Sequence, residues 1–215
     1  MIGRPREKQL LTALKHVAGT PGPQLGLRVG TPPVVYLRPV ATRRELQNES
    51  DVRCLTEWRN QFVTSFLTEF KATESQTADW LANIVGPDDN RILFMVDRDI
   101  DNLAIGYMGI GFIDWNAGYG EADSIVRGRP AARGIMTAAL RTLLAWGRGQ
   151  LGLDTIGVRV RSDNPALAFY RKFGFIEQKR VPLNNRYESN SLVWYEDQDS
   201  INATISLVYH TLAGE

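Results

Sequence analysis

Residues 121–161 contain the pattern that most restricts the fold of this chain. An alternating segment at 121–127 (EADSIVR) runs into a short turn rich in Gly and Arg (GRPAARG). Apolar residues then repeat at helical spacing over 133–146, and a second strictly alternating segment follows at 155–161. This order predicts a strand, a helix and a second strand. Two strands joined by a helix are expected to be parallel, with a right-handed crossover.

Elements of both kinds are predicted on either side of this unit. Helical periodicity indicates one helix around Val52–Arg59 and another over Ser75–Val85, and Asn164 and Pro165 are expected to open a further helix that ends before Gly174. The remaining strands are predicted at 34–40, 91–97, 103–113, 192–196 and 204–209. We therefore predict an α+β fold with a central mixed sheet.

The length of 215 residues suits one domain with a full core. Residues 6–18 read as a short amphipathic helix, and the Gly/Pro-rich segment at 19–33 breaks regular structure. We accordingly predict that residues 1–32 form an appendage of helix and linker, and that residues 33–215 form the compact domain.

Charge and cysteine content exclude several classes of function. Lys and Arg total 25 against 24 Asp and Glu, so no net field favours nucleic acid or an anionic membrane. The single Cys54 rules out an internal disulfide, and with only His16 and His210 beside it we expect no metal site. No apolar run approaches the roughly 20 residues of a membrane span. We predict a soluble, cytoplasmic protein.

The turn before the helix at 133–146 is a candidate anion site. A helix N-terminus presents unpaired N–H groups and a partial positive charge. Gly134 permits close approach of the backbone to an anion, and we expect Arg129 and Arg133 to add positive charge beside it. Taken alone, a short Gly/Arg turn before a helix is more often a plain connection between strand and helix.

The segment downstream, RVRSDNPALAFYRKFGF, contains Asn164, Tyr170 and Gly174-Phe175, and it resembles the last coenzyme-binding motif of GNAT acetyltransferases. The phosphate loop of that family reads Gln/Arg-x-x-Gly-x-Gly/Ala. The equivalent here is Ala131-x-x-Gly134-x-Met136, in which Ala131 departs from the pattern because it offers no side-chain hydrogen bond. With Met136 in its last position, the loop resembles that of the branch that includes the ribosomal-protein alanine acetyltransferases.

The resemblance implies the GNAT fold, in which helices flank a central, mixed and mostly antiparallel sheet that splays apart at two parallel strands. It also implies acetyl-CoA as co-substrate, bound at the splay. The implied contacts are the backbone groups of Ile125, Val126 and Arg127 with the pantetheine arm, those of Ala132, Arg133, Gly134, Ile135, Met136 and Thr137 with the pyrophosphate, and Asn164 and Tyr170 with the arm and its sulfur end.

Acetyl transfer to an amine calls for a base and, at the leaving thiolate, an acid. Glu121 and Asp123 alternate onto one face of their strand, and the resemblance favours Glu121 as the base, with Asp123 second. Tyr170 is the candidate acid, and the N–H of Val126, beside a bulge, is the candidate oxyanion donor. The alternative interpretation makes both carboxylates solvated strand residues and Tyr170 a core aromatic.

The segment LTEWRNQFVTSFLTEFKATESQTADWL is similar to N-acetyltransferases that modify amino sugars carried on nucleotides. Arg59 could then pair with a diphosphate, Asn60 with hydroxyl groups, and Trp58 could stack on a ring. The tail piece RVPLNNRYESNSLVWYED is similar to enzymes of surface-polysaccharide pathways. The aromatic residues from 58 to 70 are also compatible with a plain core stripe.

The predicted function is therefore acetylation of a small primary amine, with a nucleotide-linked amino sugar as the favoured acceptor. A protein N-terminus, a polyamine or an antibiotic is an alternative acceptor of the same reaction. A non-catalytic acyl-CoA-binding module is an alternative of a different class. The closing strands after Leu192 are candidates for pairing across a two-fold axis in a homodimer.

Overall fold

The computed structural model describes residues 5–17 and 26–212. Its helices are α1 (Pro5–Lys15), α2 (Glu49–Gln61), α3 (Glu74–Trp80), α4 (Ile135–Leu151) and α5 (Ala166–Phe173). Its strands are β1 (Leu27–Val29), β2 (Val35–Pro39), β3 (Thr68–Glu69), β4 (Ile92–Arg98), β5 (Ala104–Asp114), β6 (Tyr119–Arg127), β7 (Thr155–Arg161), β8 (Phe175–Glu188), β9 (Ser191–Glu196) and β10 (Ser206–Leu212).

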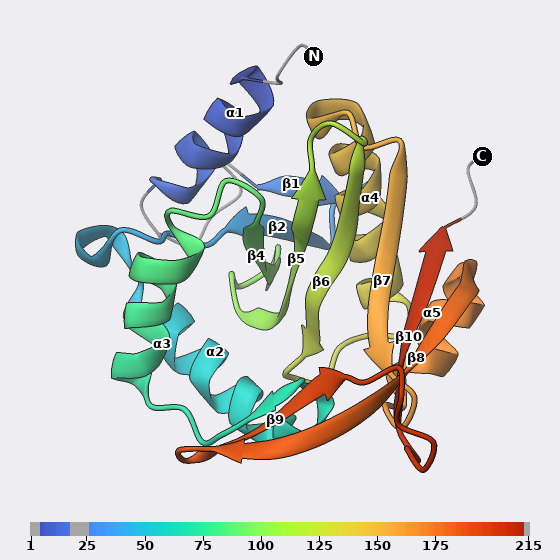
Figure 1. Cartoon of the computed structure of the whole chain (residues 1–215). Helices are drawn as coiled ribbons and strands as arrows, with labels where there is room; N and C mark the ends of the chain where they lie inside the picture. Colours follow the sequence, from blue (N-terminus) through green and yellow to red (C-terminus); the bar gives the residue numbers. More distant parts are fainter. Residues whose placement is uncertain (1–4, 18–25, 213–215) are drawn as a thin grey trace.

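The strands follow the order β1-β2-β4-β5-β6-β7-β10-β8-β9-β3 (Figure 1). Neighbouring strands are antiparallel except β6 and β7, which are parallel and are joined through α4. The predicted α+β fold with a mixed sheet and one parallel pair is thus confirmed. In Figure 1 the hairpin of β8 and β9 extends across the lower end of the sheet toward α2.

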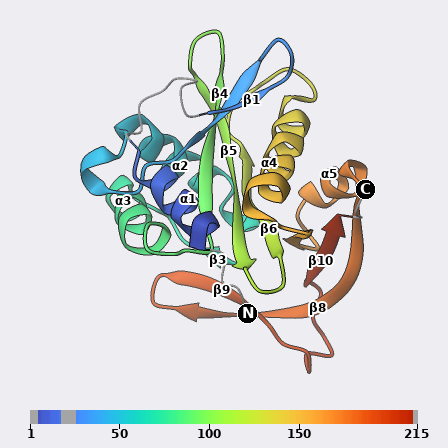
Figure 2. The same cartoon turned by 90° about the horizontal axis from the view of Figure 1, so that it is seen from above.

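Helices cover both faces of the central strands (Figure 2). On one face α4 and α5 bury apolar side chains such as Leu140 and Leu143 against alternate residues of β4–β7. On the opposite face α2 and α3 pack Leu55, Trp58 and Ala78 against the other residues of β4–β6. We call these the α4 face and the α2 face. Because successive side chains of a strand point to opposite faces, alternate residues of β6 and β7 face α4 and α5 or α2 and α3.

Three expectations differ from the structure. Residues 27–29 form β1, an edge strand, although the Gly/Pro content around them predicted irregular structure. Residues 175–188 form one long strand that the sequence did not indicate, because its residues are mostly exposed and lack apolar alternation. The plain core stripe considered for the aromatic residues from 58 to 70 would need one continuous helix, but α2 ends at Gln61 and a 3-10 turn and β3 follow.

The predicted boundary after residue 32 is not marked by a separate core. Leu11 of α1 is fully buried in the cluster that also holds the α4-face residues. The ammonium group of Lys15, 1% exposed, donates to the carbonyl oxygens of Val85, Gly86 and Asp88 at 3.1, 3.0 and 2.7 Å. These carbonyls lie just beyond α3, so Lys15 caps that end and fixes α1 to it. Residues 18–25 of the predicted linker lie outside the described residues.

Within residues 5–17 and 26–212, no helix has both the length and the apolar character needed to cross a membrane.

Candidate active site

The parallel strands β6 and β7 separate soon after they meet. Their pairing covers Tyr119–Glu121 of β6 and Thr155–Gly157 of β7, whereas the two strands continue to Arg127 and Arg161. Backbone groups along the diverging part cannot bond across the widening gap. The sheet is therefore splayed at this pair, as the sequence resemblance implied.

A β-bulge in β6 determines which backbone groups of this strand face the gap. Asp123 pairs with Gly109 and Val126 with Tyr107, so Ser124 and Ile125 share one partner, and Ser124 has a φ of 54°. The predicted bulge beside Val126 is present. A Cβ on Gly106 would clash with the carbonyl oxygen of Val126, so that carbonyl points toward β5.

After the bulge, the backbone groups of successive β6 residues point alternately toward β5 and toward the gap. Gly128 donates its N–H to the carbonyl of Ile105 at 3.0 Å, two residues beyond the bonded pair of Val126 and Tyr107. Antiparallel pairs alternate between bonded and non-bonded, so the intervening Arg127 turns its backbone groups toward the gap. The carbonyl of Ile125 points the same way, because it belongs to the trans peptide whose N–H, that of Val126, faces β5. This register favours Ile125 and Arg127 as partners of a ligand strand, and it turns Val126 away from the oxyanion role.

The predicted phosphate loop ends at the N-terminus of α4. Gly134 precedes the helix with a φ of 88°, in the left-handed region that favours glycine. A Cβ placed on Gly134 would meet no atom within 4 Å, so open space lies beside this backbone. Together with the unpaired N–H groups of a first helical turn, the loop forms a cradle whose shape and polarity fit a phosphate group.

Arg129 is turned away from this cradle. Its guanidinium donates to the carbonyl oxygen of Ala104 and lies 5.2 Å from the centre of the Trp58 ring. A Cβ on Gly128 would overlap the same indole ring. The expectation that Arg129 adds charge at the phosphate site is therefore wrong, because the residue fastens the loop to α2. Arg133 is exposed on the loop.

Asn164 and Pro165 directly precede α5, as the sequence predicted. The Oδ1 of Asn164 accepts a hydrogen bond from the backbone N–H of Ala166 at 2.9 Å. The carbonyl of Tyr170, near the other end, accepts from the N–H of Gly174, whose φ of 113° ends the helix. The cap occupies Oδ1 of Asn164 and leaves its amino group as the donor for a ligand.

Tyr170 lies 6% exposed on the side of α5 that faces the sheet. Burial, and secondly the nearby carboxylate of Asp123, raise its pKa well above the ordinary value. The phenol is consequently protonated at neutral pH and has a proton to donate. The structure thus brings Tyr170 and Asp123 within electrostatic reach of each other, although they come from opposite sides of the sheet.

Glu121 and Asp123 project from β6 onto the α2 face, as alternation predicted, but their surroundings differ. Glu121 is buried: its Oε1 accepts from the hydroxyl of Tyr119 at 2.9 Å, and its Oε2 lies 2.7 Å from Nε of Arg159. The Asp123 side chain is 27% exposed, and its charged neighbour Arg91 lies 3.7 Å away. Asp123 is therefore the more accessible carboxylate.

The three residues predicted to contact the acceptor are held by the chain itself. Trp58 is 3% exposed and stacks on Tyr107, with 6.2 Å between ring centres. Arg59 donates to the carbonyl of Thr68 at 2.6 Å, and Asn60 exchanges two hydrogen bonds with the backbone of Ala72. These contacts shape the segment after α2, and direct contact with an acceptor stays a prediction.

Sequence reasoning missed four residues near the two carboxylates, namely Tyr107, Tyr119, Phe112 and Arg159. It also missed Arg161 and Trp194, which meet at Glu69. The two arginines carried a signal, because they alternate with Ile156, Val158 and Val160 on β7 and must face the α2 side. Phe112 carried none: its ring reaches 4.0 Å from the Arg159 guanidinium through a φ of 51° that the sequence does not reveal.

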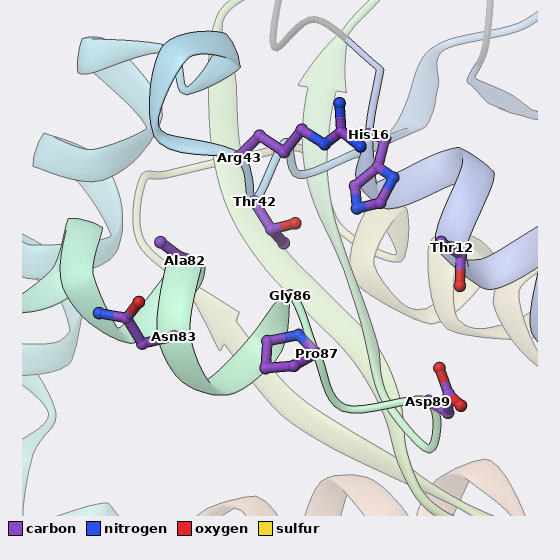
Figure 3. A pocket seen from close by; sticks show the side chains of 9 residues that line it. All are labelled: Thr12, His16, Thr42, Arg43, Ala82, Asn83, Gly86, Pro87 and Asp89. Atoms are coloured by element: carbon purple, nitrogen blue, oxygen red, sulfur yellow. The ribbon is translucent and has the colours of Figure 1, made fainter.

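A pocket of about 490 Å³ lies elsewhere, between α1, the segment after β2 and the end of α3 (Figure 3). Thr12 of α1 and His16, just after that helix, line one side of it, and Arg43 extends over it toward His16. The pocket shares no residue with the splay. Among the described residues, no group of three or more His, Cys, Asp or Glu is arranged to hold a metal ion.

Comparisons with known proteins agree with this arrangement. The family model described as Acetyltransferase (GNAT) domain matches residues 42–176. A probable GNAT-family acetyltransferase from Chromobacterium violaceum is similar in structure, with a TM-score of 0.64, 20% identity, and coverage of 92% of this chain and 95% of that one. No curated protein matches the sequence.

Two further solved structures share the fold. FdhC, described as a nucleotide-linked sugar GNAT, has a TM-score of 0.62 and 15% identity, covering 87% of this chain and 89% of its own. Spermidine N-acetyltransferase from Vibrio cholerae, in complex with CoA and spermine, has a TM-score of 0.63 and 15% identity, covering 83% and 94%. At these identities the likeness concerns the fold.

Proposed function

Because this chain belongs to the GNAT acetyltransferase family, and is therefore an acetyltransferase that acts on amines, we propose that it transfers the acetyl group of acetyl-CoA to the amino group of a nucleotide-linked sugar. One observation carries the proposal: beyond Glu121 the strands β6 and β7 separate, with two carboxylates on the α2 face and Tyr170 on the α4 face of the gap. The gap separates a coenzyme side from an acceptor side.

The coenzyme is held in this proposal mainly by backbone groups. Ile125 and Arg127 offer N–H and C=O groups to the amides of the pantetheine arm, as an added strand would. The first turn of α4 and the open backbone at Gly134 receive the pyrophosphate. The amino group of Asn164 completes the contacts with the arm. The rest of the predicted 132–137 loop lies around the same helix end.

Asp123 is the better-placed proton acceptor of the two carboxylates. The amine must lose a proton when its nitrogen attacks the thioester carbon. Both oxygens of Glu121 already accept bonds from Tyr119 and Arg159, so an incoming ammonium group would have to displace one of them. The Asp123 side chain is more exposed than that of Glu121, and its carboxylate lies near enough to Tyr170 to raise the pKa of the phenol. We therefore assign proton removal to Asp123 and orientation of Arg159 and Tyr119 to Glu121, reversing the order that the sequence favoured.

Tyr170 is the proton donor in this scheme. When the tetrahedral intermediate collapses, the carbon–sulfur bond breaks and the thiolate takes up a proton. A buried phenol with a raised pKa is neutral at physiological pH and can donate its proton to the sulfur. Tyr107 is also buried, and its pKa is raised chiefly by burial and further by Asp123, so it is a second neutral hydroxyl near that carboxylate.

The choice of a sugar nucleotide as acceptor rests on the α2 side. The segment after α2 resembles sugar-nucleotide acetyltransferases in sequence, and FdhC, a nucleotide-linked sugar GNAT, has a similar fold. Beside the carboxylates, Phe112 is half-exposed, and the guanidinium groups of Arg91 and Arg159 contact its ring. An exposed ring between two guanidinium groups suits an acceptor that combines a flat or ring-shaped part with negative charge.

Thiol release from acetyl-CoA tests the proposal with a panel of amines: nucleoside-diphosphate amino sugars, spermidine, an N-terminal peptide and an aminoglycoside. Turnover confined to the amino sugars is the expected result. Turnover with spermidine or the peptide alone would reassign the acceptor and leave the coenzyme site in place. Coenzyme binding without turnover on any amine would favour the non-catalytic module.

A further inference from the structure

A single buried arginine joins the end of β7 to the acceptor side of the molecule. Arg161 is the last residue of β7, and its side chain is 4% exposed. Two of its nitrogens, Nε and Nη2, bond the carboxylate of Asp163 at 3.1 and 2.8 Å. The third, Nη1, lies 2.7 Å from Oε1 of Glu69 and 3.2 Å from the carbonyl oxygen of Phe66. The guanidinium therefore bonds two separate chain segments at once.

Trp194 of β9 closes this cluster from the other side. Its ring lies 4.3 Å from the Arg161 guanidinium, and its Nε1 donates to Oε1 of Glu69 at 2.7 Å. Its backbone N–H donates to the carbonyl of Leu67 at 2.7 Å. We call residues 66–69 and 191–196, which include the paired strands β3 and β9, the strap. The strap is held to β7 through Arg161.

The position of Arg161 relates the strap to both halves of the proposed site. Asp163 directly precedes Asn164, which lies just before α5 and offers its amino group to the coenzyme arm. Two residues earlier on the same face of β7, Arg159 holds Glu121. A shift of Arg161 would therefore move the strap relative to the coenzyme-binding turn.

We propose that Arg161 is a positioning residue that fixes the strap as the outer wall of the acceptor site. The proposal rests on the proposed function, because the strap is an acceptor wall only if the α2 face receives the amine. A planar guanidinium with donors on two edges can hold Asp163 and Glu69 together, whereas the single ammonium group of lysine cannot reach both with the same geometry. Two carboxylates and a carbonyl also compensate the burial of its charge.

Two substitutions test this role, with a matched control on β8. Arg161→Lys keeps the positive charge and removes the planar guanidinium with its donors on two edges. Trp194→Phe keeps an aromatic ring and removes the N–H that donates to Glu69. Arg180→Lys is the control, since Arg180 on β8 also pairs with a carboxylate, Glu177, but at the exposed surface. Each protein is examined by amide hydrogen exchange, by titration with coenzyme A and by steady-state kinetics with a nucleoside-diphosphate amino sugar.

For Arg161→Lys we expect exchange in the strap to accelerate and the KM for the amine to rise, each by about tenfold or more. The Kd for coenzyme A should change less than about threefold, because the bonds at Gly134 and β6 remain. Trp194→Phe should shift the same two quantities in the same direction by a smaller factor, and Arg180→Lys should shift neither.

Two results overturn the proposal. One is strap exchange that stays unchanged in Arg161→Lys. The other is a loss of coenzyme A affinity as large as the rise in KM, which would indicate general disruption rather than positioning. Failure of the proposed function looks different: the unsubstituted protein would not bind coenzyme A, or would not turn over amines, while the exchange measurement would still report on Arg161.

Discussion

Nε of Arg159 lies 2.7 Å from Oε2 of Glu121, where the parallel strands β6 and β7 begin to separate. Gly157, the partner of Glu121 across the strands, leaves room for the hydroxyl of Tyr119, which bonds the other carboxylate oxygen. The carboxylate thus connects the two strands at their last pair. In the proposed mechanism Glu121 therefore holds the two strands together at the splay, and Asp123 removes the proton.

Substituting the two carboxylates separates these roles. Asp123→Asn removes the proposed base, and kcat should fall by about 10²- to 10⁴-fold with little change in the KM for acetyl-CoA. Glu121→Gln keeps an acceptor for Tyr119 and should lower kcat much less. Steady-state thiol release measures both, with the exposed Asp79→Asn as control. A larger loss of kcat in Glu121→Gln than in Asp123→Asn would restore Glu121 as the base.

Two glycines, one directly before α4 and one within it, test the phosphate cradle. Gly134→Ala forces a side chain into the left-handed region, at a cost of about 1–2 kcal/mol, and should weaken binding of coenzyme A. Gly149→Ala lies in the exposed helix interior with open space around it and should stabilise the fold by about 0.5–1 kcal/mol without affecting binding. Calorimetric titration and urea unfolding measure the two effects, and unimpaired binding by Gly134→Ala would argue against the cradle.

The coenzyme side of the fold was predictable because its determinants are local. A glycine before a helix, an asparagine cap and a glycine after the last turn each act on neighbouring residues, and Gly134, Asn164 and Gly174 all occupy these positions in the structure. Alternation along β6 likewise placed Glu121 and Asp123 on one face. Alternation could not show how their surroundings differ, since Arg159 reaches Glu121 only through the pairing of β6 with β7.

The acceptor side was less predictable because its contacts are distant in sequence. Arg59 and Asn60 looked available to a ligand, yet they bond carbonyls 9 and 12 residues away. Glu69 and Trp194 are 125 residues apart and meet only through the pairing of β3 with β9. The long, mostly exposed β8 that carries this hairpin has no apolar alternation to reveal it.

Lys15 should be essential for docking α1. Lys15→Met keeps an apolar side chain of similar length but leaves the carbonyls of Val85, Gly86 and Asp88 without their donor. An unsatisfied buried acceptor costs about 1–3 kcal/mol, so the free energy of unfolding should fall by at least that amount. Urea unfolding measures it against Lys71→Met, an exposed control. Equal stability of the two variants would show that α1 docks through its apolar residues alone.

His210 should make the protein less stable in mild acid. Its side chain is 1% exposed, and burial is the main cause that lowers its pKa below the ordinary 6.5, with Glu177, Arg171 and Arg180 as the charged neighbours. The unfolded chain then takes up a proton at higher pH than the folded one, so this contribution to stability is present above pH 6.5 and is lost as the pH falls through the folded pKa.

The slope of stability against pH, rather than stability itself, is the quantity that tests His210. Thermal unfolding between pH 7 and pH 5 should show a smaller loss for His210→Leu than for the unsubstituted protein, because leucine takes up no proton. The pKa of His16, the other of the two histidines, is also lowered, first by burial and then by Arg43, so His16→Gln measured alongside separates the two contributions. If His210→Leu leaves the slope unchanged, the imidazole is protonated in the folded protein without cost, and the acid sensitivity must come from other groups.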